Sequence, residues 1–377
     1  MCWQILAVHF QLRSNQILYL DRKSELKKIS KMKRIKTIDY QDLPYYVIIE
    51  IISYYKHVPR GDYKPYKLFG KFNLDKSQKT FLIFKSIFIK YSINNCNLPL
   101  KITSLEVLNC DKFIGDNLPL KIKSLIVWDS DKFIGDNLPL KIKSLKVWDS
   151  DKFIGDNLPL KIKSLNVAIC NQFKGNKLPD LITILNVDLC VKFIGDNLPL
   201  KIKSLNVDLC VNFKGNKLPG LITSLNVSAC IKFIGDNLPK LITRLEVGEC
   251  HQFIGDNLPV SITSLKVWKC YNFIGNKLPV SITSLKVELC YLFIGNNLPL
   301  KISYLKVKDC RRFIGPNLPN SITILKVKDC HQFIGNNLPT SITSLKVNDC
   351  HQFIGNNLLK SIPSLKVEDC RRFKRDK

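Results

Sequence analysis

A repeat of 20 residues constrains this chain more than any other feature of its sequence. Residues 98–377 repeat the pattern LPxxIxSLxVxxCxxFIGxN fourteen times in tandem, without insertion or deletion. Five columns hold one residue type in every copy, those of Leu98, Ile102, Leu105, Val107 and Phe113. A fixed period of this size marks stacked units that each contact only their neighbours. We therefore expect one elongated solenoid here, and not the two or three globular domains that the chain length would otherwise suggest.

Each repeat predicts one short strand followed by a turn-rich return. Leu105 and Val107 are two residues apart, which places both side chains on one face of a strand, while Ser104, Glu106 and Leu108 face the other way. Stacking the repeats pairs these strands into one parallel sheet. The remaining segment, FIGDNLPLK at 113–121, is too short for an ordinary helix and contains proline, so we expect an extended or turn-like outer side.

The cysteines predict a structural column of thiols. Twelve of the fourteen occupy one repeat position, at Cys110 and from Cys170 to Cys370, and the sequence has no CxxC and no Cys/His pair at ligand spacing. We expect these thiols to be reduced and buried, and we expect no metal and no cofactor. The opening MCWQILAVHF has too short an apolar run for a signal peptide, and no segment reaches the ~18 apolar residues of a membrane span. These features predict a protein of the cytoplasm or nucleus without a membrane partner, and of a host's cytoplasm if the protein is viral.

The string IxSLxVxxC resembles the leucine-rich-repeat signature LxxLxLxxN/C. The LPxxI opening and the 20-residue period are similar to the shortest class of these repeats in bacterial effectors, and to the FNIP repeats of amoebae and their giant viruses. The Asn-Gln-Pro element of FNIP repeats is replaced here by Ile114–Asn117, IGDN. The resemblance covers 280 of 377 residues and implies an α/β horseshoe with the parallel sheet on its concave side.

A second resemblance lies ahead of the repeats. Within residues 43–54, apolar residues at positions 44, 47, 48, 51 and 52 follow helical spacing and predict one amphipathic helix, with Pro44 near its start. The segment resembles the opening of an F-box, LPxEIIxEILSYL, although Tyr46 replaces the first glutamate. The resemblance implies that a Skp-type adaptor of a cullin ubiquitin ligase binds Leu43, Pro44, Val47, Ile48, Ile51 and Ile52. The alternative is a helix that only covers the end of the solenoid.

The chain divides into four predicted segments. A basic, flexible lead spans residues 1–38, an F-box-like helical segment 39–75, a degenerate capping coil 76–97 and the solenoid 98–377. The capping coil is predicted because Phe84, Ile87, Ile89 and Ser92 match the Ile, Leu, Val and Cys columns of the repeat. Residues 22–36 hold eight basic residues against one glutamate, which fits a phosphate-contacting or nuclear-import patch as well as a solvated linker. Met32 inside this stretch is a second candidate start beside Met1.

The net charge of +27 favours acidic partners. Residues 1–97 contribute 18 basic against 7 acidic residues, and residues 98–377 contribute 40 against 24. Charge alone is also compatible with nucleic acid, which we rank below protein as a partner.

Outward strand positions and the turn after each strand form the candidate binding surface. These columns carry the aromatic and basic residue types that dominate protein interfaces. The candidate residues are Trp128, Trp148, Trp268, Lys266, Lys286, Lys306, Lys326, Lys346, Lys366, Tyr271, Tyr291 and Arg311. Two interpretations stay open: an acidic or phosphorylated protein ligand binds the lysine column, or the lysines form a solvated face that Asp309, Asp329, Asp349 and Asp369 partly neutralise.

These observations favour a protein-interaction scaffold, in the leading hypothesis an F-box-type substrate receptor of a cullin ubiquitin ligase. The alternative is a leucine-rich-repeat scaffold without a ligase link and with an unknown ligand. An enzyme is the least supported class, because the sequence has no phosphate loop, no GxSxG and no metal-ligand set.

Overall fold

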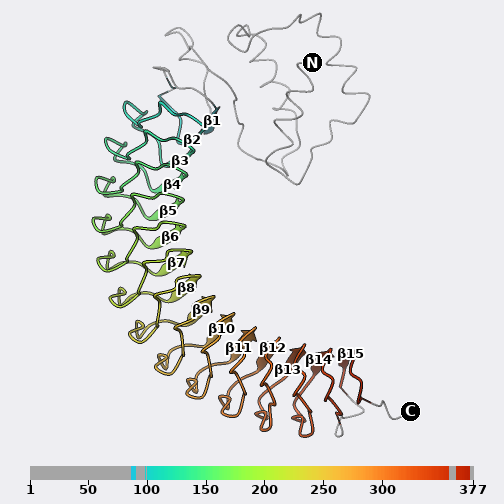
Figure 1. Ribbon diagram of the computed structural model, residues 1–377. Helices are drawn as coiled ribbons and strands as arrows, with labels where there is room; N and C mark the ends of the chain where they lie inside the picture. The colour runs from blue at the N-terminus through green and yellow to red at the C-terminus, as the bar shows by residue number, and fades with distance from the viewer. Residues whose placement is uncertain (1–85, 91–97, 99, 356–361, 374–377) are drawn as a thin grey trace, which may run out of the picture.

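The computed structural model describes residues 86–90, 98, 100–355 and 362–373, and Figure 1 draws the remaining residues as a grey trace. The described residues form a single sheet of fifteen strands in chain order. The strands are β1 (Ser86–Lys90), β2 (Ser104–Leu108), β3 (Ser124–Trp128), β4 (Ser144–Trp148), β5 (Ser164–Ala168), β6 (Ile184–Asp188), β7 (Ser204–Asp208), β8 (Ser224–Ser228), β9 (Arg244–Gly248), β10 (Ser264–Trp268), β11 (Ser284–Glu288), β12 (Tyr304–Lys308), β13 (Ile324–Lys328), β14 (Ser344–Asn348) and β15 (Ser364–Glu368).

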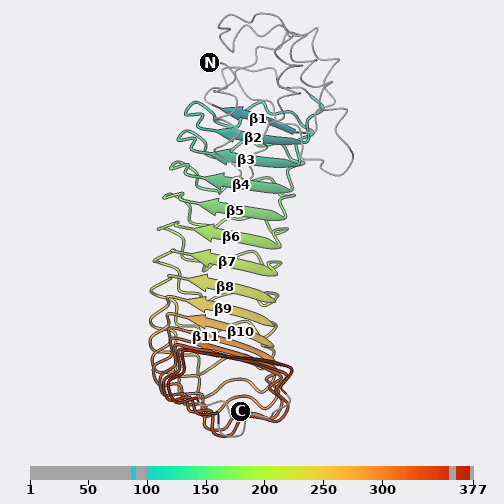
Figure 2. The same ribbon diagram turned by 90° about the vertical axis from the view of Figure 1, so that its right-hand side faces the viewer.

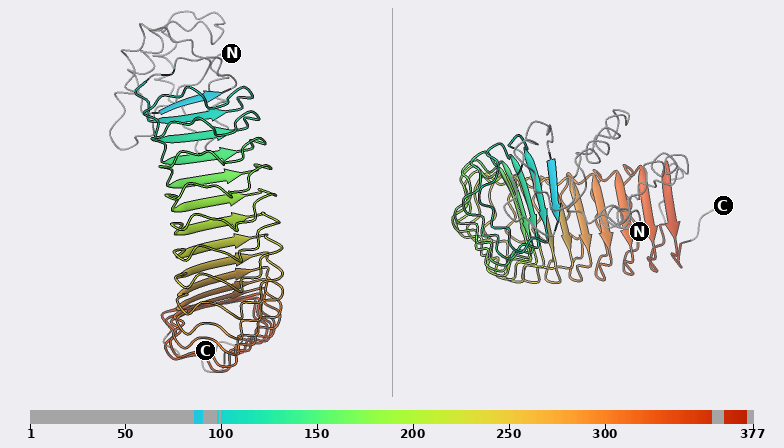
Figure 3. Two further views of the ribbon diagram at one scale, coloured as in Figure 1. Left: turned by 90° about the vertical axis from the view of Figure 1, so that its left-hand side faces the viewer. Right: turned by 90° about the horizontal axis from the view of Figure 1, so that it is seen from above.

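Every strand pairs in parallel with the next, and the register places equivalent repeat positions side by side. Leu105 pairs with Leu125 and Val107 with Val127, a relation that continues to β15. The arrows of all visible strands consequently point the same way when the sheet is viewed from either side (Figures 2 and 3). β1 precedes the regular repeats and pairs with β2 such that Ile87 lies opposite Leu105 and Ile89 opposite Val107.

The core is a set of single-residue columns between the sheet and the outer turns. The Ile, Leu, Val and Phe columns are nearly all less than 5% exposed, and the phenylalanine rings stack on one another from coil to coil. Gly115 has a φ of +92° and lies against the ring of Phe133, so this column needs glycine both for its backbone angle and for its lack of a Cβ. Burial of identical rows in every coil explains why these columns do not vary along the chain.

A left-handed residue ends each strand of the repeats. The residues in the column of Asn109 have φ between 49° and 55°, including leucine and isoleucine at positions such as Leu189 and Ile169. Their N–H groups donate to the carbonyl of the next coil, as Leu189 N does to Asp208 O at 3.0 Å. This bond extends the ladder one residue past the strand and turns the chain into the core, where the cysteine or serine that follows is buried.

The solenoid bends into an arc with the strands on its inner side (Figure 1). Hydrogen bonding holds neighbouring strands about 4.8 Å apart. The stacked phenylalanine rings on the other side of the core are 5.5–6.1 Å apart, as between Phe113 and Phe133 and between Phe233 and Phe253. Because the spacing is larger on the phenylalanine side, the sheet must form the concave surface.

The fold predicted from the sequence is confirmed for the repeats: a parallel-sheet solenoid with 20-residue coils and a turn-like outer side. The described residues contain no helix, and none of them therefore forms a helix that could cross a membrane. The α part of the expected α/β class rests on residues 39–75, which lie outside the described residues, as does the lead 1–38.

Candidate functional site

Two sets of columns make up the exposed surface along the strands. The sheet face consists of the outward strand positions, in the columns of Ser104, Glu106 and Leu108. The rim consists of the columns of Asn109 and Asp111, which follow each strand. The strands alternate between half-buried and buried residues, so the sheet face is available to a ligand while Leu105 and Val107 are closed to solvent.

Charge is unevenly distributed along this surface. Over β2–β9 the sheet face and rim carry ten carboxylates against Lys146 and Arg244, a net of −8, whereas over β10–β15 they carry eleven cations against six carboxylates, a net of +5. Adding the next column, that of Lys112, changes these values to −3 and +7 and preserves their signs. The surface is thus acidic toward β2 and basic toward β15, a polarity that the overall charge of the chain conceals.

The predicted lysine column lies in register on β10–β15, with Lys266 opposite Lys286 and so on to Lys366. Several of these cations have partners within the surface. The partners are Glu246 for Lys266 at 3.6 Å, Glu288 for Lys306 at 2.7 Å, Glu368 for Lys366 at 2.8 Å, and the ring of Tyr304 for both Lys286 and Lys326 at 5.6 Å.

Glutamates therefore offset the lysine column more than the aspartates of the rim do. Of those aspartates, Asp309 lies 3.7 Å from Lys308, which belongs to another column. Burial raises the pKa of Asp329 and the charge of Asp309 raises it further, which reflects the crowding of like charges along the rim. The carboxylates compensate only part of the positive charge of this half.

The three tryptophans do not form one site. Trp128 and Trp148 lie on β3 and β4 with ring centroids 4.0 Å apart, edge to face, at the acidic end. Trp268 lies on β10 and covers Gly248 so closely that a Cβ there would fall inside the indole, and Lys266 lies 4.4 Å above its ring. All three are half-buried rather than freely exposed. Only Trp268 adjoins the lysine column.

Aromatic and basic side chains of the rim form a stacked ladder. His251 stacks on Tyr271 at 4.8 Å, Tyr271 stacks on Tyr291 at 5.1 Å, and the guanidinium of Arg311 lies 4.7 Å from the ring of Tyr291. The predicted residues Tyr271, Tyr291 and Arg311 are thereby brought together beside the lysine column. His331 and His351 continue the same column with rings 4.5 Å apart.

The rim also holds an apolar belt that the sequence analysis did not identify. Over β5–β8 six of the eight rim positions carry large aliphatic residues that are 38–51% exposed, and the other two are Asn171 and Ala229. The belt comprises Ile169, Leu189, Val191, Leu209, Val211 and Ile231. Six adjacent exposed aliphatic side chains on neighbouring coils form a continuous patch of the kind that marks interaction surfaces. Periodic apolar residues in the rim columns were the sequence signal for it.

The thiol column is structural in the described residues. Cys110 and Cys170 to Cys350 are buried, Cys370 is half-buried, and none of the twelve is in a disulfide. The thiol of Cys170 donates to Ala168 O at 3.3 Å, and the hydroxyls of Ser130 and Ser150 donate to the equivalent carbonyls of their own coils. Burial raises the pKa of Cys170 to about 12, which suppresses the reactive thiolate.

The predicted adaptor-binding residues, Leu43 to Ile52, lie outside the described residues. Their arrangement therefore stays a prediction from sequence.

Comparison with known proteins establishes the fold class. No protein-family model and no curated protein matches the chain. Among solved structures, CroV588, described as a novel circular leucine-rich-repeat protein, matches with a TM-score of 0.54 and 22% identity over 81% of this chain and 60% of its own. The chain thus spans less than two thirds of CroV588. The observed architecture and this likeness identify a solenoid of leucine-rich-repeat type.

Two structures of YopM match less closely. YopM from Yersinia enterocolitica has a TM-score of 0.43 at 17% identity, covering 77% of this chain and 70% of that one. The leucine-rich effector YopM from Yersinia pestis has a TM-score of 0.41 at 17% identity, covering 74% and 88%.

Proposed function

We propose that the chain is a protein-interaction scaffold whose sheet face and rim over β10–β15 bind an acidic or phosphorylated segment of a protein partner. The observation that carries this proposal is the juxtaposition of the in-register lysine column, Lys266 to Lys366, with the ring ladder from His251 to Arg311. Lysine and arginine attract carboxylates and phosphates, while tyrosine and tryptophan supply large contact areas at low entropic cost.

The proposed interface extends beyond the basic half. The apolar belt over β5–β8 is separated from the basic half by β9, but its last member, Ile231, precedes His251 of the ring ladder in the same column. The belt supplies hydrophobic contact area, so that the ligand surface has an apolar part and a charged part. Like-charged surfaces repel, so the acidic coils β2–β4 disfavour the acidic segment and set its position along the arc.

A direct test uses defined peptides and full-length protein. We expect an acidic or phosphorylated peptide to bind, and a peptide with lysine in place of its acidic residues not to bind, as measured by fluorescence anisotropy. The variant Lys286→Glu/Lys326→Glu/Lys346→Glu should lose at least about tenfold in affinity, roughly 1.4 kcal/mol.

The matched control reverses the same number of charges elsewhere. Lys121, Lys141 and Lys161 are exposed in a turn that precedes the strands, outside the sheet face and rim. Lys121→Glu/Lys141→Glu/Lys161→Glu should retain wild-type affinity within about threefold, since distant surface charges act mainly through screened long-range forces. Equal losses of peptide affinity in both variants would show that binding depends only on the net charge of the protein, and would contradict a specific binding surface over β10–β15.

A finer proposal concerns residues 39–75, which we propose recruit a Skp-type adaptor and make the chain a ubiquitin-ligase receptor. It rests on the F-box-like sequence from Leu43 to Ile52. Recombinant adaptor should co-elute with the wild type, and Ile48→Asp/Ile52→Asp should abolish co-elution without changing the anisotropy titration. Failure of wild-type protein to bind any adaptor, with peptide binding intact, would leave the scaffold without a ligase link.

A further inference from the structure

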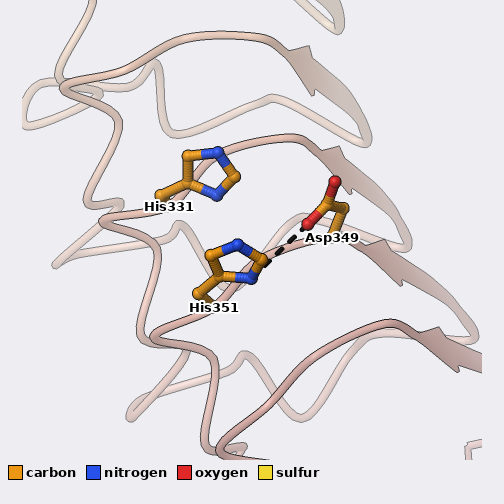
Figure 4. Close-up of side chains that lie close together, drawn as sticks. All are labelled: His331, Asp349 and His351. Carbon is orange, nitrogen blue, oxygen red and sulfur yellow. Dashed lines mark ion pairs between the residues drawn. The ribbon is translucent and has the colours of Figure 1, made fainter.

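His331, Asp349 and His351 bring three metal-ligating groups to one point of the rim. One nitrogen of each imidazole and one carboxylate oxygen all lie within 4.8 Å of one another. Figure 4 shows the two imidazoles one above the other, with the Asp349 carboxylate directed at His351. Asp349 and His351 belong to one coil and His331 to the coil before it, 20 residues from His351, so the three residues do not form a local metal-binding motif in the sequence.

The solenoid geometry accounts for the convergence. His331 and His351 occupy the same column of consecutive coils, which stacks their rings at 4.5 Å. Asp349 precedes His351 by two residues and has a φ of 49°, and its N–H donates to Glu368 O at 3.0 Å. That bond fixes the backbone turn from which both Asp349 and His351 project.

One atom of this group lacks a hydrogen-bond partner. Nδ1 of His351 is shielded from solvent, and it neither donates nor accepts a hydrogen bond in the described part of the chain. Oδ1 of Asp349 lies 3.4 Å from it, within ion-pair range but not aligned for a hydrogen bond. A shielded polar nitrogen without a partner is costly, and a cation between the nitrogen and the carboxylate would satisfy both.

We propose that His331, Asp349 and His351 bind one divalent transition-metal ion of the zinc type. Two imidazole nitrogens and one carboxylate oxygen are the donor set that Zn²⁺ accepts, whereas Ca²⁺ and Mg²⁺ prefer oxygen donors alone. Three protein ligands leave a fourth position for water or for a donor from a bound partner. This site does not depend on the peptide-binding proposal.

Side-chain rotations bring the ligands to binding distance. Tetrahedral zinc with bonds of about 2.0 Å requires donor atoms about 3.3 Å apart. The donor atoms of this group lie up to 4.8 Å apart, so they must approach one another to bind the ion. His331 is exposed, so its ring has room to rotate toward the other two ligands. Asp329 and Asp369, on the coils before and after Asp349 in the same column, add negative charge that favours a cation, whereas Arg311 and Arg371, which flank the two histidines in their column, oppose it.

The experiment titrates full-length protein with Zn²⁺ and follows the imidazole nitrogens by long-range ¹H–¹⁵N correlation spectra. The chain has five histidines, so each signal is assignable by substitution. We expect His331 and His351 to shift together and saturate at one equivalent, while His251, in the same rim column, stays unchanged. Equal shifts of His251 and His331, or no saturation, would reduce the effect to adventitious surface binding and overturn the proposal.

Calorimetry with variants provides the second readout. His351→Asn and Asp349→Asn should each lower zinc affinity at least about tenfold, while the matched control His251→Asn should leave it unchanged. The rim column of His351 carries Asp, Asn, Val, Tyr and Arg in other coils, so the substitution is compatible with the fold. Circular dichroism verifies this for each variant. Wild-type affinity in His351→Asn, with the fold intact, would place the bound zinc elsewhere in the chain and reject the site.

Discussion

The ring of Phe213 lies against the backbone of Gly195, where a Cβ would sit 2.6 Å from its Cε2 atom. Gly195 also has a φ of +81°, a region that residues with a Cβ rarely adopt. Both relations recur along the phenylalanine column, so a glycine and the ring of the next coil form the joint between successive turns of the solenoid.

Gly195→Ala should therefore destabilise the protein, whereas Gly220→Ala should not. We expect a loss of about 2–4 kcal/mol for Gly195→Ala, because backbone strain and overpacking each cost about 1–3 kcal/mol. Gly220 has no heavy atom within 4 Å of a built Cβ and no positive φ, so its substitution is a matched control. Urea unfolding followed by circular dichroism measures both. Equal midpoints would show that the joint tolerates a methyl group.

The thiol column predicts a loss of stability in alkali. Burial raises the pKa of Cys170 from an ordinary value of 9.0 to about 12. Unfolded thiols lose their protons above about pH 9 while folded ones keep them, so this contribution is complete below pH 9 and is lost as the pH rises toward 12.

Cys170→Ser removes one such titration. The serine hydroxyl can donate to Ala168 O as the thiol does, because Ser150 makes the equivalent hydrogen bond to Trp148 O in the preceding coil. Relative to wild type, the variant should gain about 1.4 kcal/mol for each pH unit between about pH 9 and 11. Urea titrations at pH 7, 9 and 10.5 test this. A constant difference across these values would mean that Cys170 does not titrate on unfolding.

The apolar belt predicts substitutions that change the surface without harming the fold. Leu189 and Leu209 adopt the left-handed backbone that Asn109 adopts in the first coil, and asparagine tolerates it better than leucine. Leu189→Asn/Leu209→Asn should leave the free energy of unfolding within about 1 kcal/mol of wild type, since eased backbone strain offsets the lost burial. Binding of a hydrophobic dye such as ANS should fall. Unchanged dye binding would place the exposed apolar area elsewhere.

Whole coils should be removable. Residues 118–137 and 138–157 differ only at Ile126 and Lys146, and their strands pair in identical register. Deleting 118–137 should give a folded, shorter solenoid with a thermal midpoint within about 5 °C of wild type, because stability sums over neighbouring repeats. Deleting 118–127 should unfold several coils, since half a period places buried columns in solvent. Similar midpoints for both deletions would contradict strict register.

Much of the fold followed from the sequence because its cause is local. Leu105 and Val107 alternate with outward residues at the period of a strand, and the proline and glycine of the outer segment rule out a helix. The left-handed residue after each strand was not predicted, because Leu189 and Ile169 give no sign of a positive φ. At these positions the hydrogen bond from the backbone N–H to the carbonyl of the next coil outweighs the preference of leucine and isoleucine for negative φ.

The site was predictable by column but not by contact. Lys266 to Lys366 could be aligned from the period alone, yet their pairing with Glu246, Glu288 and Tyr304 depends on side-chain reach across strands. The opposite net charges of the two halves of the surface were not predicted, because lysines outside the sheet face and rim make the net charge of the whole chain positive.

Each strand in the described part of the chain contacts only the strands next to it in the sequence. Mechanically the solenoid is a curved elastic rod. Its curvature is the sum of small bends between successive coils, and each bend is set by the difference between the strand spacing and the spacing of the phenylalanine rings. A slight, evenly shared change at every bend moves the two ends through a large arc at little cost per coil. A ligand that spans many coils would thus alter the radius of the whole molecule, and the stiffness of the arc would enter its affinity.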